Sequence, residues 1–105
     1  MDEQQERELL RRAIGRYGQT HQILKCVEEL SELQKELCRL TELSLTGAGV
    51  NHPEETGRAR ARVTEETADV LITLRQLGMM LDNEPAVETA RQGKLERLRA
   101  RLSHR

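Results

Sequence analysis

Two pairs of acidic residues are the part of this sequence best suited to chemistry. Two residues separate the members of each pair, which are Glu29 with Glu32 and Glu66 with Asp69. Residues three apart on a helix project from the same face, so each pair would offer two oxygen ligands to one point. If the two segments pack together, four carboxylates surround one position and raise one another's pKa unless a cation lies between them. Acidic oxygen ligands suit a hard ion, so the pattern predicts a site for Mg²⁺, or for Mn²⁺ in its place, and metal-dependent phosphate chemistry.

Helical periodicity places these acids beside predicted apolar faces. At 100° per residue, Glu66 lies about 60° from the centre of its apolar stripe, and Asp69 lies on the same side. Glu29 borders the apolar stripe of the earlier helix, while Glu32 lies further out. Because an unpaired carboxylate is costly to desolvate, acids in such positions indicate a partner. That partner is either a metal ion or a basic side chain in an ordinary salt bridge, such as Lys25, Arg62 or Arg75.

The last predicted helix has a basic side that also bears on phosphate chemistry. Lys94, Arg97 and Arg101 recur there at intervals of three and four residues. Lysine and arginine side chains are common phosphate ligands. A basic face near a helix C-terminus is also typical of a solvated surface, because cations are favourable there. We expect a phosphate contact from Lys94 and a solvated position for Arg101.

The acidic pairs belong to two segments that resemble a known family. Residues Lys25–Leu33 and Glu65–Leu71 together are similar to the E-x-x-E … E-x-x-D signature of MazG-like nucleotide pyrophosphohydrolases, of the short type found in phages and bacteria. The similarity extends outward to Tyr17 and to the segment Lys94–Leu98, and it covers roughly residues 15–102. The 33 residues between Glu32 and Glu66 are a longer linker than is usual in the family.

The resemblance implies an all-α enzyme that cleaves a nucleoside triphosphate to the monophosphate and pyrophosphate with the help of Mg²⁺. It assigns the metal to four ligands, namely Glu29, Glu32, Glu66 and Asp69. It assigns activation of water to the metal or to Glu29 or Glu32, and charge neutralisation on the leaving pyrophosphate to Lys94. Further contacts to the nucleotide are expected from Tyr17, Gln22, Lys25, Lys94 and Arg97. Tyr17 is the one aromatic residue in the chain, so it alone could stack on a base.

Three alternatives to this function remain at the level of the sequence. The first is the same hydrolysis of another nucleotide, such as phosphoribosyl-ATP. The second is a helical oligomerisation or adaptor module without catalysis. The third, a helical DNA-binding module, is disfavoured because 17 basic and 18 acidic residues give a net charge of −1 and no positive field.

Length and composition predict a small domain that needs a partner. The chain has 105 residues, predicted to form one all-α domain over residues 1–105, and 36% are hydrophobic while 33% are charged. So few apolar residues on long helices predict a core shared between copies, in a homodimer or homotetramer. No apolar run approaches the roughly 20 residues that span a bilayer, so no membrane contact is expected. The acidic N-terminus lacks a signal sequence, which predicts a cytoplasmic protein with nucleoside triphosphate, and not nucleic acid, as its partner.

The helices that position the acids are predicted to form an antiparallel bundle of about four helices. Helices are predicted over residues 2–17, 20–45, 53–81 and 84–103, with a loop between the second and the third. Thr20 is expected to cap the second helix. The apolar stripe of that helix is predicted to comprise Ile23, Val27, Leu30, Leu33, Leu37 and Leu40. Cys26 and Cys38 fall on the same side and are expected to be buried, reduced thiols.

Overall fold

Residues 1–104 of the computed structural model form four long helices, one short helix and no strand, and the side chains of residues 48 and 49 are not described. The predicted all-helical fold is confirmed, with helix ends within one or two residues of those expected. The helices are α1 (Glu3–Tyr17), α2 (Gln19–Leu45), α3 (Ala48–Asn51), α4 (Pro53–Leu81) and α5 (Glu84–Ser103). Within the described residues, none of these helices is both long and apolar enough to cross a lipid bilayer.

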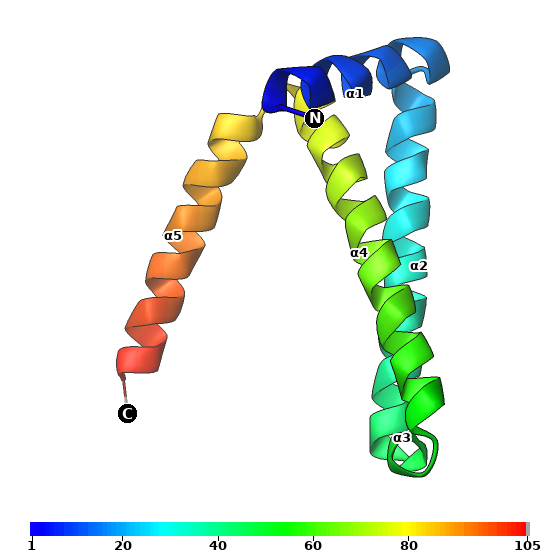
Figure 1. The fold of residues 1–105 in the computed structure, drawn as a ribbon. Helices are drawn as coiled ribbons and strands as arrows, with labels where there is room; N and C mark the ends of the chain where they lie inside the picture. The colour runs from blue at the N-terminus through cyan, green and yellow to red at the C-terminus, as the bar shows by residue number, and fades with distance from the viewer. Residues whose placement is uncertain (105) are drawn as a thin grey trace.

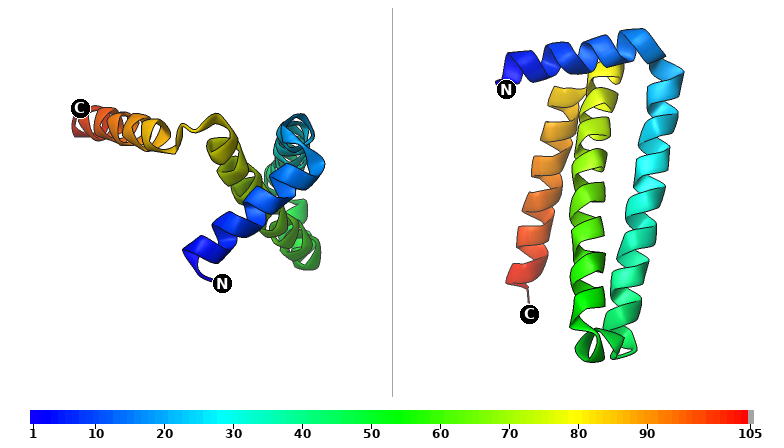
Figure 2. Two further views of the ribbon diagram at one scale, coloured as in Figure 1. Left: turned by 90° about the horizontal axis from the view of Figure 1, so that it is seen from above. Right: turned by 45° about the vertical axis from the view of Figure 1, so that its right-hand side comes forward.

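The centre of the molecule is the pair formed by α2 and α4, which lie side by side along most of their length (Figure 1). The chain turns from one helix to the other through α3. At the opposite end of the pair, α1 crosses over both helices (Figure 2). This pair is therefore the scaffold on which the two acidic segments can meet.

Helix α1 passes into α2 through a single glycine. Asp2 caps α1, because its carboxylate accepts a hydrogen bond of 2.8 Å from the Gln5 amide while the Gln5 side chain accepts one of 2.9 Å in return. Gly18 then adopts φ 91° and ψ 153°, a conformation open to glycine alone, so α2 begins at the next residue. The prediction that Thr20 caps α2 is wrong, because this turn places Thr20 inside the first turn of the helix.

The connection between α2 and α4 contains a short helix where the sequence predicts a loop. Gly47 has a φ of 73°, which ends α2, and α3 follows directly. The Val50 amide donates to the Gly47 carbonyl over 3.1 Å. Pro53 starts α4, where its missing N–H costs nothing, as the sequence predicts. The positive φ of Gly47 therefore lets the chain leave α2 and turn directly into α3.

The interface between α2 and α4 is more polar than the sequence predicts. Its fully buried residues are Gln22, Cys26, Glu29 and Leu43 from α2, and Ala59, Val70, Thr73 and Gln76 from α4. Much of the predicted apolar stripe of α2 instead stays exposed, namely Ile23, Val27, Leu30 and Leu37. Cys26 is buried as expected, whereas the prediction for Cys38 is wrong because this thiol is exposed. The physical reason is that α2 has apolar residues on two adjacent faces, and one neighbouring helix covers only one of them.

Helix α5 stands apart from the other helices. It contacts α4 next to the turn that joins them and then diverges from the pair (Figures 1 and 2). None of the residues of α5 is fully buried. A single copy of the chain therefore leaves one complete helix with little packing.

Candidate metal centre

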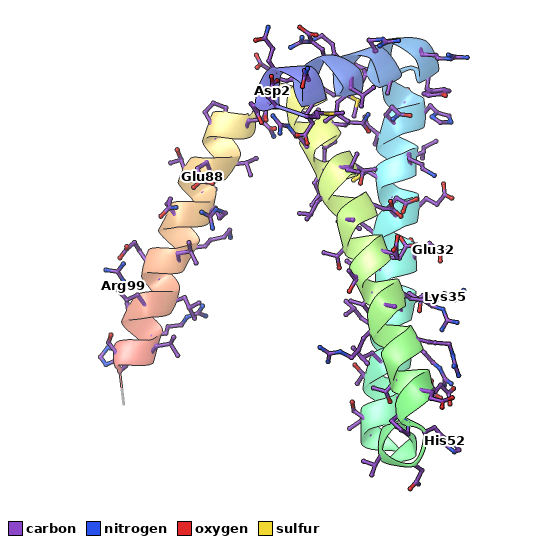
Figure 3. The ribbon with its side chains drawn as sticks, in the orientation of Figure 1. Asp2, Glu32, Lys35, His52, Glu88 and Arg99 are labelled. Atoms are coloured by element: carbon purple, nitrogen blue, oxygen red, sulfur yellow. The ribbon has the colours of Figure 1, made fainter. Side chains whose placement is uncertain are left out.

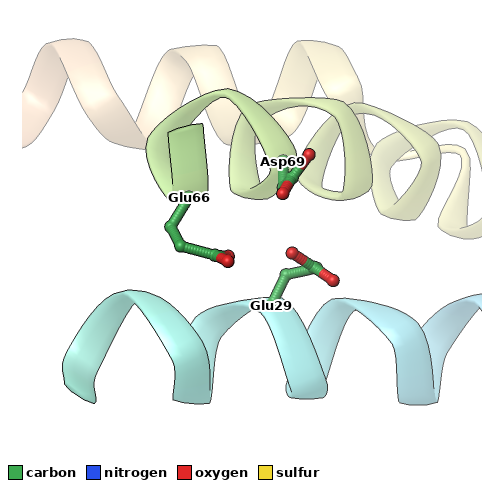
Figure 4. A group of neighbouring side chains, drawn as sticks. All are labelled: Glu29, Glu66 and Asp69. Carbon is green, nitrogen blue, oxygen red and sulfur yellow. The ribbon is translucent and has the colours of Figure 1, made fainter. Parts of the chain in front are cut away.

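The two acidic segments meet across α2 and α4. Glu66 and Asp69 project from α4 toward Glu29 on α2 (Figure 4). One carboxylate oxygen from each residue lies within 4.8 Å of the other two. Glu29 is 8% exposed and Glu66 is half-buried, whereas Asp69 is exposed. Three carboxylates thus surround one position that is closed by the helix pair on one side and open to solvent beside Asp69.

Glu32 lies at the edge of this group. Its carboxylate is not among the three that converge, although its charge contributes to the raised pKa of Glu66. It is half-buried and one turn further along α2 than Glu29. Of the four ligands predicted from the sequence, the structure brings three together and places the fourth nearby.

The electrostatics of the group disfavour three free negative charges. Burial raises the pKa of Glu66, and a hydrogen bond with Glu29 and the charges of the neighbouring acids raise it further. The pKa of Asp69 is also raised, first by burial and then by the charge of Glu29. Both shifts have one cause in common, since a carboxylate held near other carboxylates and away from water retains its proton more strongly. A cation in the group would remove this cost.

Lys25 is the one basic side chain that the structure joins to the three acids, within its described residues. Its Nζ lies 3.3 Å from Oε1 of Glu29. This contact, followed by the charge of Glu28, raises the pKa of Lys25. The alternative interpretation of the sequence expects an ordinary salt bridge at these acids. Such a salt bridge is present at Glu29, where the charge of Lys25 compensates part of the carboxylate's charge.

Glu66 and Asp69 have no such partner. No ion pair joins either of them to a basic residue in the part of the chain that the structure describes, and Oε2 of Glu66 is buried without a hydrogen bond. Arg75, which the alternative interpretation pairs with them, instead binds Glu3 and Glu6 of α1. A buried carboxylate oxygen without a donor costs free energy, and a hard cation fits both this oxygen and the all-carboxylate ligand set. The three residues could therefore hold a metal ion.

A line of polar contacts leads from the start of α2 toward the acids. The ring of Tyr17 stacks on His21 with 5.4 Å between ring centres, and Nδ1 of His21 lies 2.8 Å from Oε1 of Gln22. The Gln22 amide donates to Oε1 of Gln76 over 3.0 Å inside the α2/α4 interface. Gln22, predicted to contact nucleotide, is thus buried and already paired, whereas Tyr17 is exposed.

Thr73 and Gln76 belong to this region and were not predicted from the sequence. Both are buried in the interface, and with Glu66 and Asp69 they form a series spaced three, four and three residues apart on α4. That spacing keeps four polar side chains on one face of the helix. A search for polar residues in register with the acids would have found them.

The structure does not bring Lys94 or Arg97 to the carboxylates within one chain. Both are exposed on α5, which does not lie along α2. Figure 3 shows Glu88 and Arg99 on this helix, away from Glu32 on α2. Arg101 is exposed too, as the sequence predicts.

Comparison of the chain with protein-family models, with curated proteins and with solved structures finds no match. The resemblance to MazG-like enzymes therefore rests on the two acidic motifs and the residues around them. The geometry of Glu29, Glu66 and Asp69 is an independent observation, because it follows from the packing of α2 on α4 and not from the motifs.

Proposed function

We propose that this protein is a Mg²⁺-dependent pyrophosphohydrolase that cleaves a nucleoside triphosphate to the monophosphate and pyrophosphate. The observation that carries the proposal is the convergence of three carboxylates from two helices, two of which lack a basic partner in the described residues. The convergence supports a site for a divalent cation. The motif resemblance supports the choice of a nucleoside triphosphate as substrate.

Each acid has a role that suits its environment. Glu29, Glu66 and Asp69 would hold the ion, which when bound would neutralise and orient the phosphate oxygens. Glu32 lies outside the group of three, so its carboxylate is free to accept a proton from the attacking water. Glu29 is the alternative base, but it is one of the three acids that would hold the ion, and it already contacts Lys25.

We propose Lys25 as the cation that contacts the phosphates. It already lies at the carboxylate group, and its ammonium is partly exposed on the solvent side. Lys94 and Arg97 would take this role only in an assembly that carries α5 of some copy to the acids. Because Lys25 and Lys94 lie on different helices, separate substitutions can show which of the two lysines contacts the phosphates.

We propose further that the working form is a homodimer or homotetramer, in which helices of several copies complete an antiparallel bundle. The exposed apolar residues of α2 and α5 support this assembly, since side chains of this size and number are normally covered. A cytoplasmic location is part of the proposal, because nucleoside triphosphates are made and used there.

Release of pyrophosphate tests the function. The substrates are the canonical ribo- and deoxyribonucleoside triphosphates and phosphoribosyl-ATP, each with Mg²⁺, with Mn²⁺ and with chelator. We expect turnover of at least one triphosphate that requires the divalent ion. Glu66→Gln should abolish it and should weaken Mg²⁺ binding by about tenfold or more, since even the loss of a residue that only hydrogen-bonds to a metal ligand weakens metal binding by that much.

Glu65→Gln is the matched control, because Glu65 is the neighbouring acid and is exposed. It should retain both activity and Mg²⁺ binding. Hydrolysis of phosphoribosyl-ATP alone would favour the second substrate class. Mg²⁺ binding without any turnover would favour a helical module without catalysis, and equal behaviour of wild type and Glu66→Gln would contradict the metal centre.

A further inference from the structure

Helix α5 has an apolar side that nothing in a single chain covers. Val87, Leu95, Leu98 and Leu102 fall within one sector of the helix, and they are 42–77% exposed. Packing of an apolar face supplies most of the stability of helices in proteins. The side of α5 formed by these four residues, here called the α5 stripe, therefore requires a partner.

The start of α5 is held in place, so the helix does not simply fold back on its own chain. Glu84 binds Arg7 of α1 through both carboxylate oxygens, with Nη2 2.5 Å from Oε1 and Nη1 3.4 Å from Oε2. The Glu84 side chain also lies directly over Gly78, where a Cβ would come within 2.8 Å of its Cγ. Only Asp82 and Asn83 separate α4 from α5, and Asp82 has a φ of 51°. This anchored, two-residue connection sets the direction in which α5 leaves the body.

Helix α2 has a second apolar face that is also uncovered. It lies about 110° around the helix from the interface with α4 and carries Ile23, Val27, Leu30, Leu37 and Leu45. Its C-terminal part forms an open groove of about 570 Å³ that includes Leu30, Leu37 and Leu45, together with the exposed thiol of Cys38. We call this part the α2 groove.

The α5 stripe and the α2 groove match in length and in charge. Fifteen positions separate Val87 from Leu102, and fifteen separate Leu30 from Leu45, which is about 22 Å of helix in each case. The α5 segment from Val87 to Leu102 contains five basic residues and two acidic residues. The α2 segment from Leu30 to Leu45 contains three acidic residues and two basic residues. Opposite charges on the two helices favour their association and disfavour pairing of like with like.

We propose that α5 of one copy packs its stripe into the α2 groove of a second copy, and that the second copy returns the same contact. The exchange buries both apolar faces in one isologous interface, as a two-fold dimer requires. It specifies the interface of the homo-oligomer proposed above, and it does not depend on whether the protein hydrolyses nucleotides.

Oligomeric state, measured by size-exclusion chromatography with light scattering, gives the first test. Wild type is a dimer, and either Leu98→Glu in the stripe or Leu37→Glu in the groove converts it to a monomer at the same concentration. Ala100→Glu is the matched control on α5, because Ala100 is exposed about 200° around the helix from Leu98. It remains a dimer. Circular dichroism checks that each variant keeps its helices.

Cys38 provides a second, local test because it lies in the groove. In the wild-type dimer it reacts with a maleimide at least tenfold more slowly than in Leu98→Glu, while Cys26, buried in the α2/α4 interface, stays slow in both. Leu95 lies opposite or next to Cys38 when the α5 stripe and the α2 groove are aligned in either direction, so Leu95→Cys, under mild oxidation, forms an intermolecular disulfide with Cys38 that Cys38→Ser abolishes.

Three results overturn the proposal. If wild type is a monomer, no second copy occupies the α2 groove. If Cys38 reacts rapidly with maleimide in the wild-type dimer, the groove is not covered by α5. A dimer that survives Leu98→Glu with Cys38 still protected shows that two α2 faces pack on each other, or that another surface is used. Each of these results is separate from pyrophosphate release, which tests the chemistry of the carboxylates alone.

Discussion

At the scale of single residues, the three converging carboxylates have unequal environments. Glu29 is buried and contacts Lys25, Glu66 has one oxygen without a donor, and Asp69 faces solvent. Asp69 is thus the most accessible of the three acids, and Glu29 is the most enclosed. Oε2 of Glu66 gains most from the ion, because among the described residues of the group it is the carboxylate oxygen that is buried without a hydrogen-bond donor.

The raised pKa values of Glu66 and Asp69 predict how stability depends on pH. The folded protein holds these protons to a higher pH than the unfolded chain, whose values are near 4.5 and 3.8. Their contribution is therefore fully present below those values and is lost as pH rises through the raised pKa of each group. In chelator, Glu66→Gln should become increasingly more stable than wild type as the pH rises above about 4.5.

Thermal unfolding of both proteins across this pH range measures the effect, and the difference between them removes the contribution of other groups. Glu3 is one such group, since the hydrogen bond from Arg75 lowers its pKa and gives the opposite sign. Added Mg²⁺ should raise the wild-type Tm more at pH 7 than at pH 4, because only ionised carboxylates bind the ion. A Tm difference independent of pH would argue against coupled acids.

The two lysines predicted to contact phosphate can be compared directly. Lys25→Ala should lower kcat/KM by roughly ten- to hundredfold, since a charge-assisted contact contributes about 1.5–3 kcal/mol. Lys94→Ala should have a much smaller effect, because α5 does not carry Lys94 to the acids of its own chain. Steady-state kinetics with saturating Mg²⁺ decides between them. A larger loss in Lys94→Ala would mean that another copy delivers Lys94 to the site.

At the scale of the helices, the α2/α4 pair combines a polar interface near the site with short glycine turns at its ends. The hydrogen bond between Gln22 and Gln76 is buried about two turns from the acids on each helix. Such a pair holds the register of the two helices, because a shift along either axis would leave both amides unpaired. The register in turn places Glu29 opposite Glu66 and Asp69.

Breaking this amide pair should show its contribution. Gln76→Met leaves the Gln22 amide buried without its partner and should cost about 1–3 kcal/mol of unfolding free energy. The double variant Gln22→Met, Gln76→Met should cost less than the sum of the single changes, since neither polar group then remains unpaired. Urea unfolding at one protein concentration gives the comparison. Strict additivity would show that the two side chains act independently.

The turn at Gly18 makes a prediction with an internal control. Gly18→Ala forces a side chain into a conformation that only glycine adopts easily and should destabilise the protein by about 1–3 kcal/mol. Gly15→Ala lies three residues earlier in α1, where nothing stands within 4 Å of the new Cβ. It should stabilise by about 0.5–1 kcal/mol through the higher helix propensity of alanine. Relative to wild type, the denaturant concentration at the midpoint of unfolding should therefore fall for Gly18→Ala and rise for Gly15→Ala.

At the scale of the whole molecule, one chain leaves large apolar side chains exposed on α2, α4 and α5. Extended principal dimensions of 47 × 41 × 26 Å agree with a chain in which one helix stands apart. Association of copies would cover these surfaces and link stability to protein concentration. The Tm of wild type should thus rise with concentration, because mass action favours the folded oligomer.

Calorimetry over a hundredfold range of concentration measures this dependence. Leu37→Glu should remove most of it, since the charged side chain disfavours burial of α2 against a second copy. A wild-type Tm that does not change with concentration would contradict assembly through these faces.

The sequence by itself determined the local features of this protein. Spacings of three and four residues and the positions of Gly18 and Pro53 are properties of short segments, so the four long helices follow from them. The i, i+3 pairs likewise predicted that Glu29, Glu66 and Asp69 share faces that can converge. These features depend on backbone geometry, which is the same in every helix.

Only the tertiary structure decided which of two adjacent faces of α2 packs on α4. Leu30 and Leu37 belong to an apolar stripe with the spacing typical of a buried helix face. The helix nevertheless leaves them exposed and buries Gln22 and Glu29. The pairing of Gln22 with Gln76, 54 residues apart, and the anchoring of Glu84 by Arg7, 77 residues apart, depend on the register and crossing of whole helices. Contacts between distant residues arise from the packing of complete elements, so no local pattern of residues encodes them.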